Sequence, residues 1–227
     1  MSIAPIGCAS ELEALSPGEI VAWAGREFGS GLVVTASFGD AVLAHLVSQH
    51  APDAEVVLID TQYLFAETRW YAEKVSRRLQ LNLTVVRPDG AVVPDDRWEH
   101  DTNGCCQARK VEPLNRALSG KQAWISGLRR ADTPARADAP VIAWDDDRQL
   151  FKINPLVAMS DEDVDRYNAE HRLPRHPLAD KGYPSIGCWP CTRPVAPGED
   201  ARSGRWAGDA KTECGLHLPV SAERRAS

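Results

Sequence analysis

Short β-branched runs alternate with amphipathic helical patterns through the first half of the chain, and this alternation constrains the fold more than any other feature. The predicted strands are residues 32–36, 55–60, 83–86 and 122–126. The expected helices include residues 16–28 and 64–81, and one whose apolar face carries Val42, Leu43, Leu46 and Val47. Strands separated by helical patterns of ten or more residues imply right-handed crossovers in a parallel sheet. The sequence therefore predicts an α/β fold.

Beyond the fourth predicted strand, the pattern indicates a hairpin over residues 141–144 and 149–153, and then a helix capped by Ser160. Periodicity disappears from Leu173 onward, where proline, glycine and arginine become frequent, so this part is expected to be loop. No internal repeat and no second hydrophobic core is visible, which favours a single domain spanning residues 1–227. Its core is expected at about residues 16–172, followed by a loop and tail at about 173–217.

Polar segments follow three of the predicted strands. They are Ser37–Asp40, Asp60–Thr61 and Gly127–Arg130. Ligands of parallel α/β sheets bind outside the carboxyl ends of the strands, so we expect these segments to meet at one edge. Ser37–Asp40 could place backbone N–H groups near a phosphate or ribose because a helix comes after it, although no Walker A or Gly-x-Gly-x-x-Gly pattern is present.

Four cysteines in two close pairs, Cys105-Cys106 and Cys188-Trp-Pro-Cys191, are suited to a tetrahedral sulfur site. Structural zinc draws its ligands from spaced knuckles, which adjacent cysteines fit poorly. Neighbouring thiolates can instead reach two irons of one cubane, so we favour a 4Fe–4S cluster. Structural zinc, buried thiols and a redox disulfide are the alternatives.

A polar loop over residues 88–104 is predicted to lead into a helix that starts near Cys105, and Pro113 either ends this helix or begins a second one. Lys110 lies four residues after Cys106, so one helix would place both on the same face. A cubane held by four thiolates carries net negative charge, which a nearby ammonium offsets. We therefore predict a functional role for Lys110 rather than that of a solvated helix lysine.

A fifth thiol, Cys214, lies in the tail, with Lys211 before it and His217 after it. Nearby cations lower the pKa of a thiol, and Gly215 gives the backbone freedom, whereas the carboxylate of Glu213 acts against activation. We predict that Cys214 is a mobile nucleophile. The remaining cysteine, Cys8, is expected to be a bystander near the N-terminus.

Arginines cluster in the loops expected around the carboxyl edge. They are Arg129, Arg130, Arg202 and Arg205. Arginine offers planar, bidentate donors for phosphate or sulfate, so the cluster predicts an oxyanion pocket; arginines scattered over the surface are the alternative.

The formal net charge of −6 argues against a general nucleic-acid binder, whose affinity rests on a basic surface. No apolar run is long enough for a transmembrane helix, and the N-terminus lacks the pattern of a secretion signal. We therefore expect no membrane partner and a cytoplasmic location, where thiols are kept reduced and cysteines serve metals or catalysis.

Several motifs in order resemble the sulfonucleotide reductases, and among them most closely the assimilatory adenylyl-sulfate (APS) reductases. The resemblance covers about residues 32–217. The motifs are Leu58-Ile-Asp-Thr61, Cys105-Cys106-x-x-x-Lys110, Gly127-Leu-Arg-Arg130, Tyr183-Pro-Ser-Ile-Gly-Cys188-x-x-Cys191, Arg202-x-x-Arg205-Trp206 and Lys211-Thr-Glu-Cys-Gly-Leu-His217.

The resemblance implies a Rossmann-like parallel sheet with helices on both faces, of the adenine-nucleotide α-hydrolase type. It implies a 4Fe–4S cluster on the four paired cysteines. It also implies that Cys214 attacks the sulfur of APS, expels AMP and becomes an S-sulfocysteine, from which thioredoxin or a glutaredoxin-like dithiol releases sulfite. The residues then expected to bind substrate are Lys110, Arg129, Arg202, Arg205, Ser37, Asp60, Thr61 and His217.

The chain departs from many relatives at Ser37-Phe-Gly-Asp40, which is shorter than their corresponding loop. No thioredoxin-like domain comes after His217, so the reductant is expected to be a separate protein. Three alternatives stay open at this point: a reductase for the 3′-phosphorylated substrate PAPS or for both nucleotides, a non-catalytic iron–sulfur redox sensor, and an adenylating enzyme of the ATP-pyrophosphatase type. The oligomeric state is open too, and a homo-oligomer is compatible with the sequence.

Overall fold

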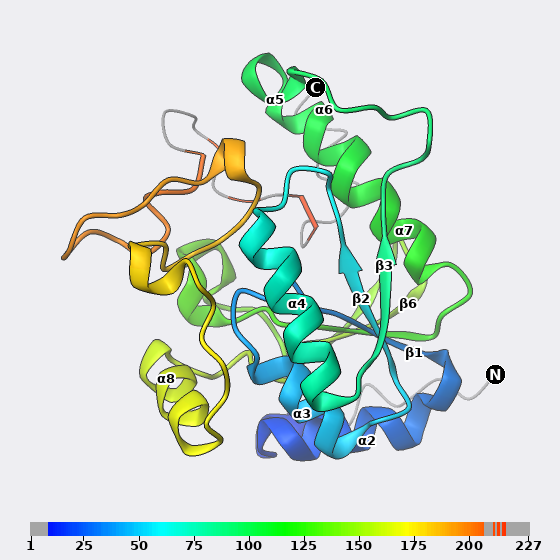
Figure 1. Cartoon of the computed structure of the whole chain (residues 1–227). Helices are drawn as coiled ribbons and strands as arrows, with labels where there is room; N and C mark the ends of the chain where they lie inside the picture. The colour runs from blue at the N-terminus through cyan, green and yellow to red at the C-terminus, as the bar shows by residue number, and fades with distance from the viewer. Residues whose placement is uncertain (1–8, 207–210, 212, 214, 217–227) are drawn as a thin grey trace.

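Six strands form one sheet in the order β3-β2-β1-β4-β6-β5 in the computed structural model, which describes residues 9–206, 211, 213, 215 and 216 (Figure 1). The strands are β1 (Leu32–Thr35), β2 (Glu55–Ile59), β3 (Asn82–Val86), β4 (Ala123–Ser126), β5 (Ile142–Asp145) and β6 (Leu150–Ile153). The pairs β1–β2, β1–β4, β2–β3 and β4–β6 are parallel. Among these strands β5 alone runs antiparallel, as the edge of the predicted hairpin. The expected parallel sheet is therefore confirmed.

Helices fill the connections. They are α1 (Ala9–Glu13), α2 (Pro17–Phe28), α3 (Val42–His50), α4 (Ala66–Leu79), α5 (Arg97–His100), α6 (Thr102–Cys106), α7 (Glu112–Leu118) and α8 (Asp161–Glu170). Capping boxes are present at Ser16, whose hydroxyl accepts from the N–H of Glu19, and at Ser160, the predicted cap, whose hydroxyl accepts from the N–H of Asp163. Each box satisfies N–H groups that have no partner inside the helix, which explains where α2 and α8 begin.

The sheet is buried on both faces because successive residues of a strand point to opposite sides. Val34 and Val56 belong to a large apolar cluster that includes buried residues of α2, α3 and α4. Their neighbours Val33 and Val57 belong to a smaller cluster, which also contains Leu114, Leu118, Trp124 and Leu150 from α7, β4 and β6. Helices therefore cover both faces, as the expected fold requires.

The segment from residue 88 to 104 differs from the sequence-based expectation of a loop. It contains α5, and α6 begins at Thr102, before the cysteine pair, because Asp101 accepts a hydrogen bond from the N–H of Gly104 and caps the helix. The continuation is a π-helix over Gln107–Val111. Pro113 is the second residue of α7, which continues directly from the π-helix.

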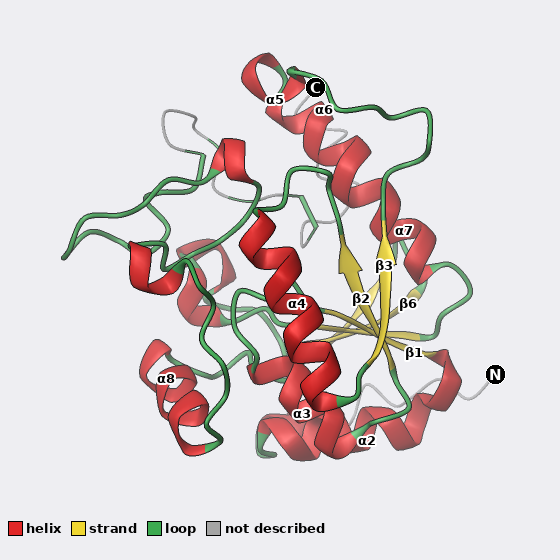
Figure 2. Cartoon of the chain, viewed as in Figure 1, coloured by secondary structure: helices red, strands yellow, loops and turns green. Residues whose placement is uncertain are grey.

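After α8 the described residues take an irregular path with only short 3₁₀ turns, as expected (Figure 2). Buried His176 fastens this segment to α4. Its Nδ1 accepts from the N–H of Leu178 at 3.1 Å, so the ring proton lies on Nε2 and is donated to Thr68 Oγ1 at 3.1 Å. Tyr71 of α4 packs against the ring and donates its hydroxyl to the carbonyl of Pro174 at 2.6 Å. Burial lowers the pKa of His176 to about 4.

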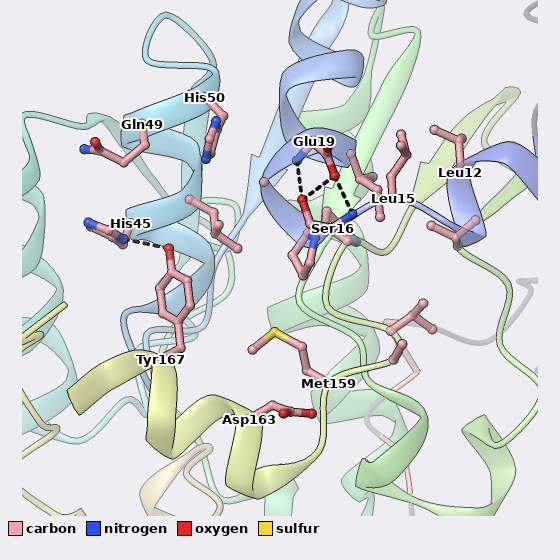
Figure 3. Close-up of a pocket in the computed structure, with 18 of the residues that line it drawn as sticks. Leu12, Leu15, Ser16, Glu19, His45, Gln49, His50, Met159, Asp163 and Tyr167 are labelled. Carbon is pink, nitrogen blue, oxygen red and sulfur yellow. Dashed lines mark hydrogen bonds between the residues drawn. The ribbon is translucent and has the colours of Figure 1, made fainter. Parts of the chain in front are cut away.

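A cavity of about 800 Å³ lies among α2, α3 and α8 (Figure 3). His45 of α3 and Tyr167 of α8 form a hydrogen bond of 2.8 Å at its wall. None of the residues that the sequence predicts for the active site lines this cavity. Within the described ranges, no helix is long and apolar enough to cross a membrane.

We predict that acid weakens the fold through His176. An unfolded histidine takes up a proton near its ordinary pKa of 6.5, whereas His176 resists protonation down to about pH 4, so the unfolded state binds more protons between these values. The free energy of unfolding should therefore fall by about 2 kcal/mol between pH 7 and pH 5 from this group alone. Urea unfolding of wild type and His176→Gln at both pH values measures it. The variant should lose this dependence, and exposed His50→Gln should retain it; equal slopes in wild type and His176→Gln would contradict the assignment.

Candidate active site

The four paired cysteines line one small cavity, although the two pairs are far apart in the sequence. Cys105 and Cys106 enter it from the end of α6, and Cys188 and Cys191 from the 3₁₀ turn at Trp189–Cys191. Cys105, Cys106 and Cys188 are buried, and Cys191 is half-buried. The other lining residues are Tyr63, Trp98, Thr102, Arg109, Lys110 and Pro190. The predicted pairing of these two motifs in space is therefore present.

The loop after β2 holds the second cysteine pair in place. Trp189 donates its N–H to the carbonyl of Tyr63 at 2.8 Å, and Thr61 Oγ1 lies 3.2 Å from Cys188 Sγ. Leu64 and Cys188 form an isolated antiparallel bridge. Backbone and side-chain contacts together therefore tie the predicted Asp60–Thr61 segment to the wall of the cysteine cavity.

Two thiols of this cavity, those of Cys105 and Cys191, resist ionisation. Burial raises the pKa of Cys105, and it raises the pKa of Cys191 to about 11. In both cases the neighbouring cysteines add to the effect and Lys110 opposes it. Within the part of the chain that the structure describes, no group of three or more His, Cys, Asp or Glu side chains is arranged so that it could hold a metal ion.

The π-helix after Cys106 directs two basic side chains into the protein. Arg109 and Lys110 are both buried and both line the cysteine cavity, where plain α-helical spacing had been expected for Lys110. A π-helical turn adds a residue to the helix and rotates the residues beyond it, and such turns are frequent at functional sites. Lys110 therefore lies beside the thiols, as predicted, but it belongs to a π-helix and not to the α-helix that was expected.

Three of the predicted substrate-binding cations surround the buried indole of Trp206. The distances to the ring centroid are 5.9 Å from Lys110 Nζ, 6.0 Å from Arg202 Cζ and 4.6 Å from Arg205 Cζ. Contact with an aromatic face stabilises a cation away from water. The Arg205 side chain also donates to Ser185 Oγ at 3.2 Å, which joins it to the loop that precedes Cys188. Trp206 thus gathers positive charge from two segments that are distant in the sequence.

Arg129, the fourth predicted cation, lies at the carboxyl end of β4 in an ion-pair network. Its Nη2 is 2.9 Å from Asp132 Oδ1 and 2.8 Å from Asp161 Oδ1. Burial lowers the pKa of Arg129, but Asp132, Asp161 and Asp40 outweigh burial and raise it overall. Its Nη1 is buried and has no hydrogen-bond partner among the described residues. Arg130 has a different environment, since it donates to Glu13 Oε1 at 2.7 Å and to the carbonyl of Ala139 at 2.8 Å.

The polar segments after β1 and β2 lie at the same edge of the sheet, as predicted. The strand order reverses between β1 and β4, which makes this edge a topological switch point where ligands of such sheets bind. Asp60 is buried and accepts from the N–H of Gln62 and from Arg87 Nε, both at 3.0 Å. Ser37 is exposed. The roles of Ser37, Asp60 and Thr61 toward a substrate stay predictions.

Cys214 and His217 lie outside the described residues, so the predicted nucleophile has no structural account. The described residues around position 214 make definite contacts. Glu213 Oε2 is 2.5 Å from Arg136 Nη2, Lys211 donates to Asn103 Oδ1, and Leu216 packs against the apolar cluster that contains Val33 and Trp124.

Sequence reasoning missed several residues that build this site. Arg109 is buried, lies 3.1 Å from Asp95 Oδ1, and stacks its guanidinium 4.6 Å from the ring of Tyr63. Its position three residues after Cys106 was the available signal. Arg136, the partner of Glu213, lies in a turn that carries no recognisable motif, so nothing in the sequence pointed to its role. Glu213 was expected to act against thiol activation, but its charge is paired.

The chain matches the family described as the phosphoadenosine phosphosulfate reductase domain over residues 31–194. Among curated proteins it is similar to adenosine 5′-phosphosulfate reductase of Rhodococcus opacus, with 44% identity over 225 residues that cover 92% of this chain and 91% of the relative. The protein of the same name from Geobacillus thermodenitrificans is 44% identical over 209 residues, covering 88% of this chain and 89% of the relative.

Among solved structures, the phosphoadenylyl-sulfate reductase of Candida auris, a phosphate complex, has a TM-score of 0.75 and 30% identity, covering 85% of this chain and 99% of that one. The FMN adenylyltransferase of Candida glabrata in complex with ATP has a TM-score of 0.59 at 15% identity, covering 93% and 79%. This second likeness concerns the fold alone and agrees with the adenine-nucleotide α-hydrolase type. On the family match and the two curated relatives, the chain belongs to the phosphoadenosine phosphosulfate reductase domain family.

Proposed function

We propose that this protein reduces adenosine 5′-phosphosulfate to sulfite and AMP, with thioredoxin or a similar dithiol protein as the electron donor. The observation that carries the proposal is the union of the two cysteine pairs in one cavity, beside the three cations that surround Trp206. The curated relatives named adenosine 5′-phosphosulfate reductase, which match this chain over about nine tenths of its length, support the same activity. The reducing conditions that the reaction needs favour the cytoplasm.

The proposed reaction is a displacement followed by a thiol exchange. The thiolate of Cys214 forms a bond to the sulfate sulfur of the nucleotide, and the bond from that sulfur to the bridging oxygen breaks, so that AMP leaves with the electron pair. The protein then carries a Cys–S–SO₃⁻ adduct. A thiolate of thioredoxin attacks Sγ of Cys214 and releases sulfite, and the second thioredoxin thiol resolves the mixed disulfide. Thioredoxin therefore supplies both electrons.

The basic residues would bind the phosphosulfate and offset the charge that develops on the departing AMP. Lys110, Arg202 and Arg205 are held together by Trp206 before any ligand arrives, so no reorganisation is needed to use their charge. Arg129 Nη1 is a buried donor without a partner among the described residues, and an anionic oxygen would satisfy it. These four cations are the proposed oxyanion site.

The donor set of the cysteine cavity fits a 4Fe–4S cluster. Such a cluster takes one thiolate on each of four irons, so its ligands need not converge on one point, whereas a zinc ion needs four donors around a single centre. The four cysteines that line the cavity supply this set. When bound, the cluster would add negative charge close to Lys110. The buried ammonium of Lys110 lies beside the thiols and would balance that charge.

The 3′-phosphorylated nucleotide is the second candidate substrate, because the solved relative from Candida auris is named a phosphoadenylyl-sulfate reductase. The names of the curated relatives favour the form without the 3′-phosphate. A redox sensor without catalysis would have no use for an oxyanion site beside its sulfur site, so we place it behind both reductases.

We predict that Cys214→Ser abolishes sulfite release, because it removes the nucleophile. Wild type mixed with the nucleotide in the absence of reductant should gain one sulfonate group on Cys214, seen by mass spectrometry of the intact protein and its peptides. Thioredoxin should release that group. The variant should gain none and should keep its iron. An adduct on another residue, or no adduct on wild type that contains iron, would contradict the proposed reaction.

We also predict which thiols hold iron. Cys188→Ala should lose most of the roughly four irons per chain expected for a cubane, together with its visible absorbance, since an open ligand position destabilises the cluster. Iron analysis after anaerobic purification measures this directly. Cys8→Ser is the matched control and should bind iron as wild type does. Full iron content in Cys188→Ala would exclude the proposed ligand set.

A further inference from the structure

We infer that Glu213 and Arg136 are positioning residues. Their ion pair fixes the tail at the residue that directly precedes Cys214. This inference rests on the proposed function, because it concerns the placement of the proposed nucleophile. Neither residue is needed to hold the sulfur site, since neither lines the cysteine cavity. Their role is deduced from the contacts of Glu213, which directly precedes Cys214 in the chain.

The carboxylate of Glu213 is held by three donors. Arg136 donates from Nε to Oε1 at 2.7 Å and from Nη2 to Oε2 at 2.5 Å, which is the two-pronged geometry of an arginine–carboxylate pair. Thr133 Oγ1 donates to Oε1 at 3.1 Å. A bidentate pair fixes the orientation of the carboxylate as well as its position, unlike a contact from a point charge such as lysine.

The pair is removed from water and its arginine is oriented in turn. The side chains of Arg136 and Glu213 are 10% and 8% exposed. Arg136 Nη1 lies 2.7 Å from Asp132 Oδ2, and the other oxygen of Asp132 binds Arg129. Burial raises the pKa of Glu213, but the hydrogen bonds and charge of Arg136, with contributions from Arg202 and Thr133, outweigh burial and lower it overall. Glu213 is therefore ionised and paired at neutral pH.

Two further contacts anchor the described residues on either side of position 214. Lys211 reaches Asn103 of α6, and Leu216 packs against the apolar cluster that includes Leu114 of α7. Among these anchors, Glu213 is nearest in sequence to Cys214 and has the most directional contact. A small displacement of a reacting group costs a large factor in rate, so the loss of this anchor should slow the chemical step.

The test compares Glu213→Gln and Arg136→Lys with a matched control, Arg148→Lys. Arg148 is a buried arginine paired with Asp145 at 2.8 Å, with side chains 6% and 12% exposed, but this pair joins residues of the β5–β6 hairpin. The rate of sulfonate transfer to the protein is measured in a single turnover without reductant, per iron-containing molecule. The affinity for the nucleotide is measured separately in the Cys214→Ser background.

We expect Glu213→Gln and Arg136→Lys to slow sulfonate transfer by about 10- to 100-fold, with the nucleotide affinity changed by less than about threefold, because the defect is one of placement. Arg148→Lys should transfer at the wild-type rate. The double variant should be no slower than the slower single variant, since the two residues act as one unit. Transfer rates in both single variants equal to that of Arg148→Lys would overturn the inference.

Hydrogen exchange of the peptide covering residues 211–216, without nucleotide, separates this inference from the proposed function. Faster exchange in Glu213→Gln and Arg136→Lys than in Arg148→Lys supports the anchor even if wild type forms no sulfonate adduct, which would defeat the proposed function alone. Equal exchange in all proteins, together with equal transfer rates, defeats the anchor and leaves the proposed function intact.

Discussion

The contact between the loop after β2 and the loop that carries Cys188 is the interaction on which the rest of the site depends. The N–H of Trp189 donates to Tyr63, and Thr61 lies against the sulfur of Cys188. The first loop continues directly from a strand of the sheet, which leaves it little freedom, while the second belongs to a segment with only short 3₁₀ turns. The irregular segment that carries Cys188 is thereby held in place by a loop that is itself fixed by the sheet. The same segment is also fastened to α4 through His176.

The net charge of −6 does not show that positive side chains gather at the candidate site. The chain is acidic overall, yet Lys110, Arg202 and Arg205 converge on one indole, and Arg129 lies in a network with Asp132 and Asp161. These cations make two kinds of contact. Arg129 is paired with carboxylates, whereas Lys110, Arg202 and Arg205 lie against an aromatic ring, which carries no net charge of its own. The charge of Arg202 also lowers the pKa of Glu213, so it acts on the tail as well as at the ring.

The described residues on both sides of position 214 are held by contacts of two kinds. The charge of Glu213 is paired with Arg136, so Glu213 does not act as a free anion beside the proposed nucleophile. Leu216 adds apolar contact with the cluster on the α7 face of the sheet. One anchor is thus polar and the other apolar. Together they fix the described residues that precede and follow position 214.

Local patterns in the sequence determined the parallel sheet, the hairpin, the two capping boxes and the grouping of the four cysteines, because each depends on residues close together in the chain or on a specific pair of motifs. They did not indicate α5, the π-helix after Cys106, or the burial of Arg109. The burial of Arg109 depends on contacts with Gln62, Tyr63 and Asp95, which lie well outside the local window.

The sequence by itself therefore determined the class of fold, the two cysteine motifs that meet in one cavity and the cations near them. Only the tertiary structure decided which arginines share a carboxylate and which face Trp206, and that Arg136 pairs with Glu213 across 77 positions of the chain. The physical reason is that an ion pair or a cation–π contact has no periodicity. Its partners are chosen by the geometry of the folded backbone, which brings distant parts of the chain together.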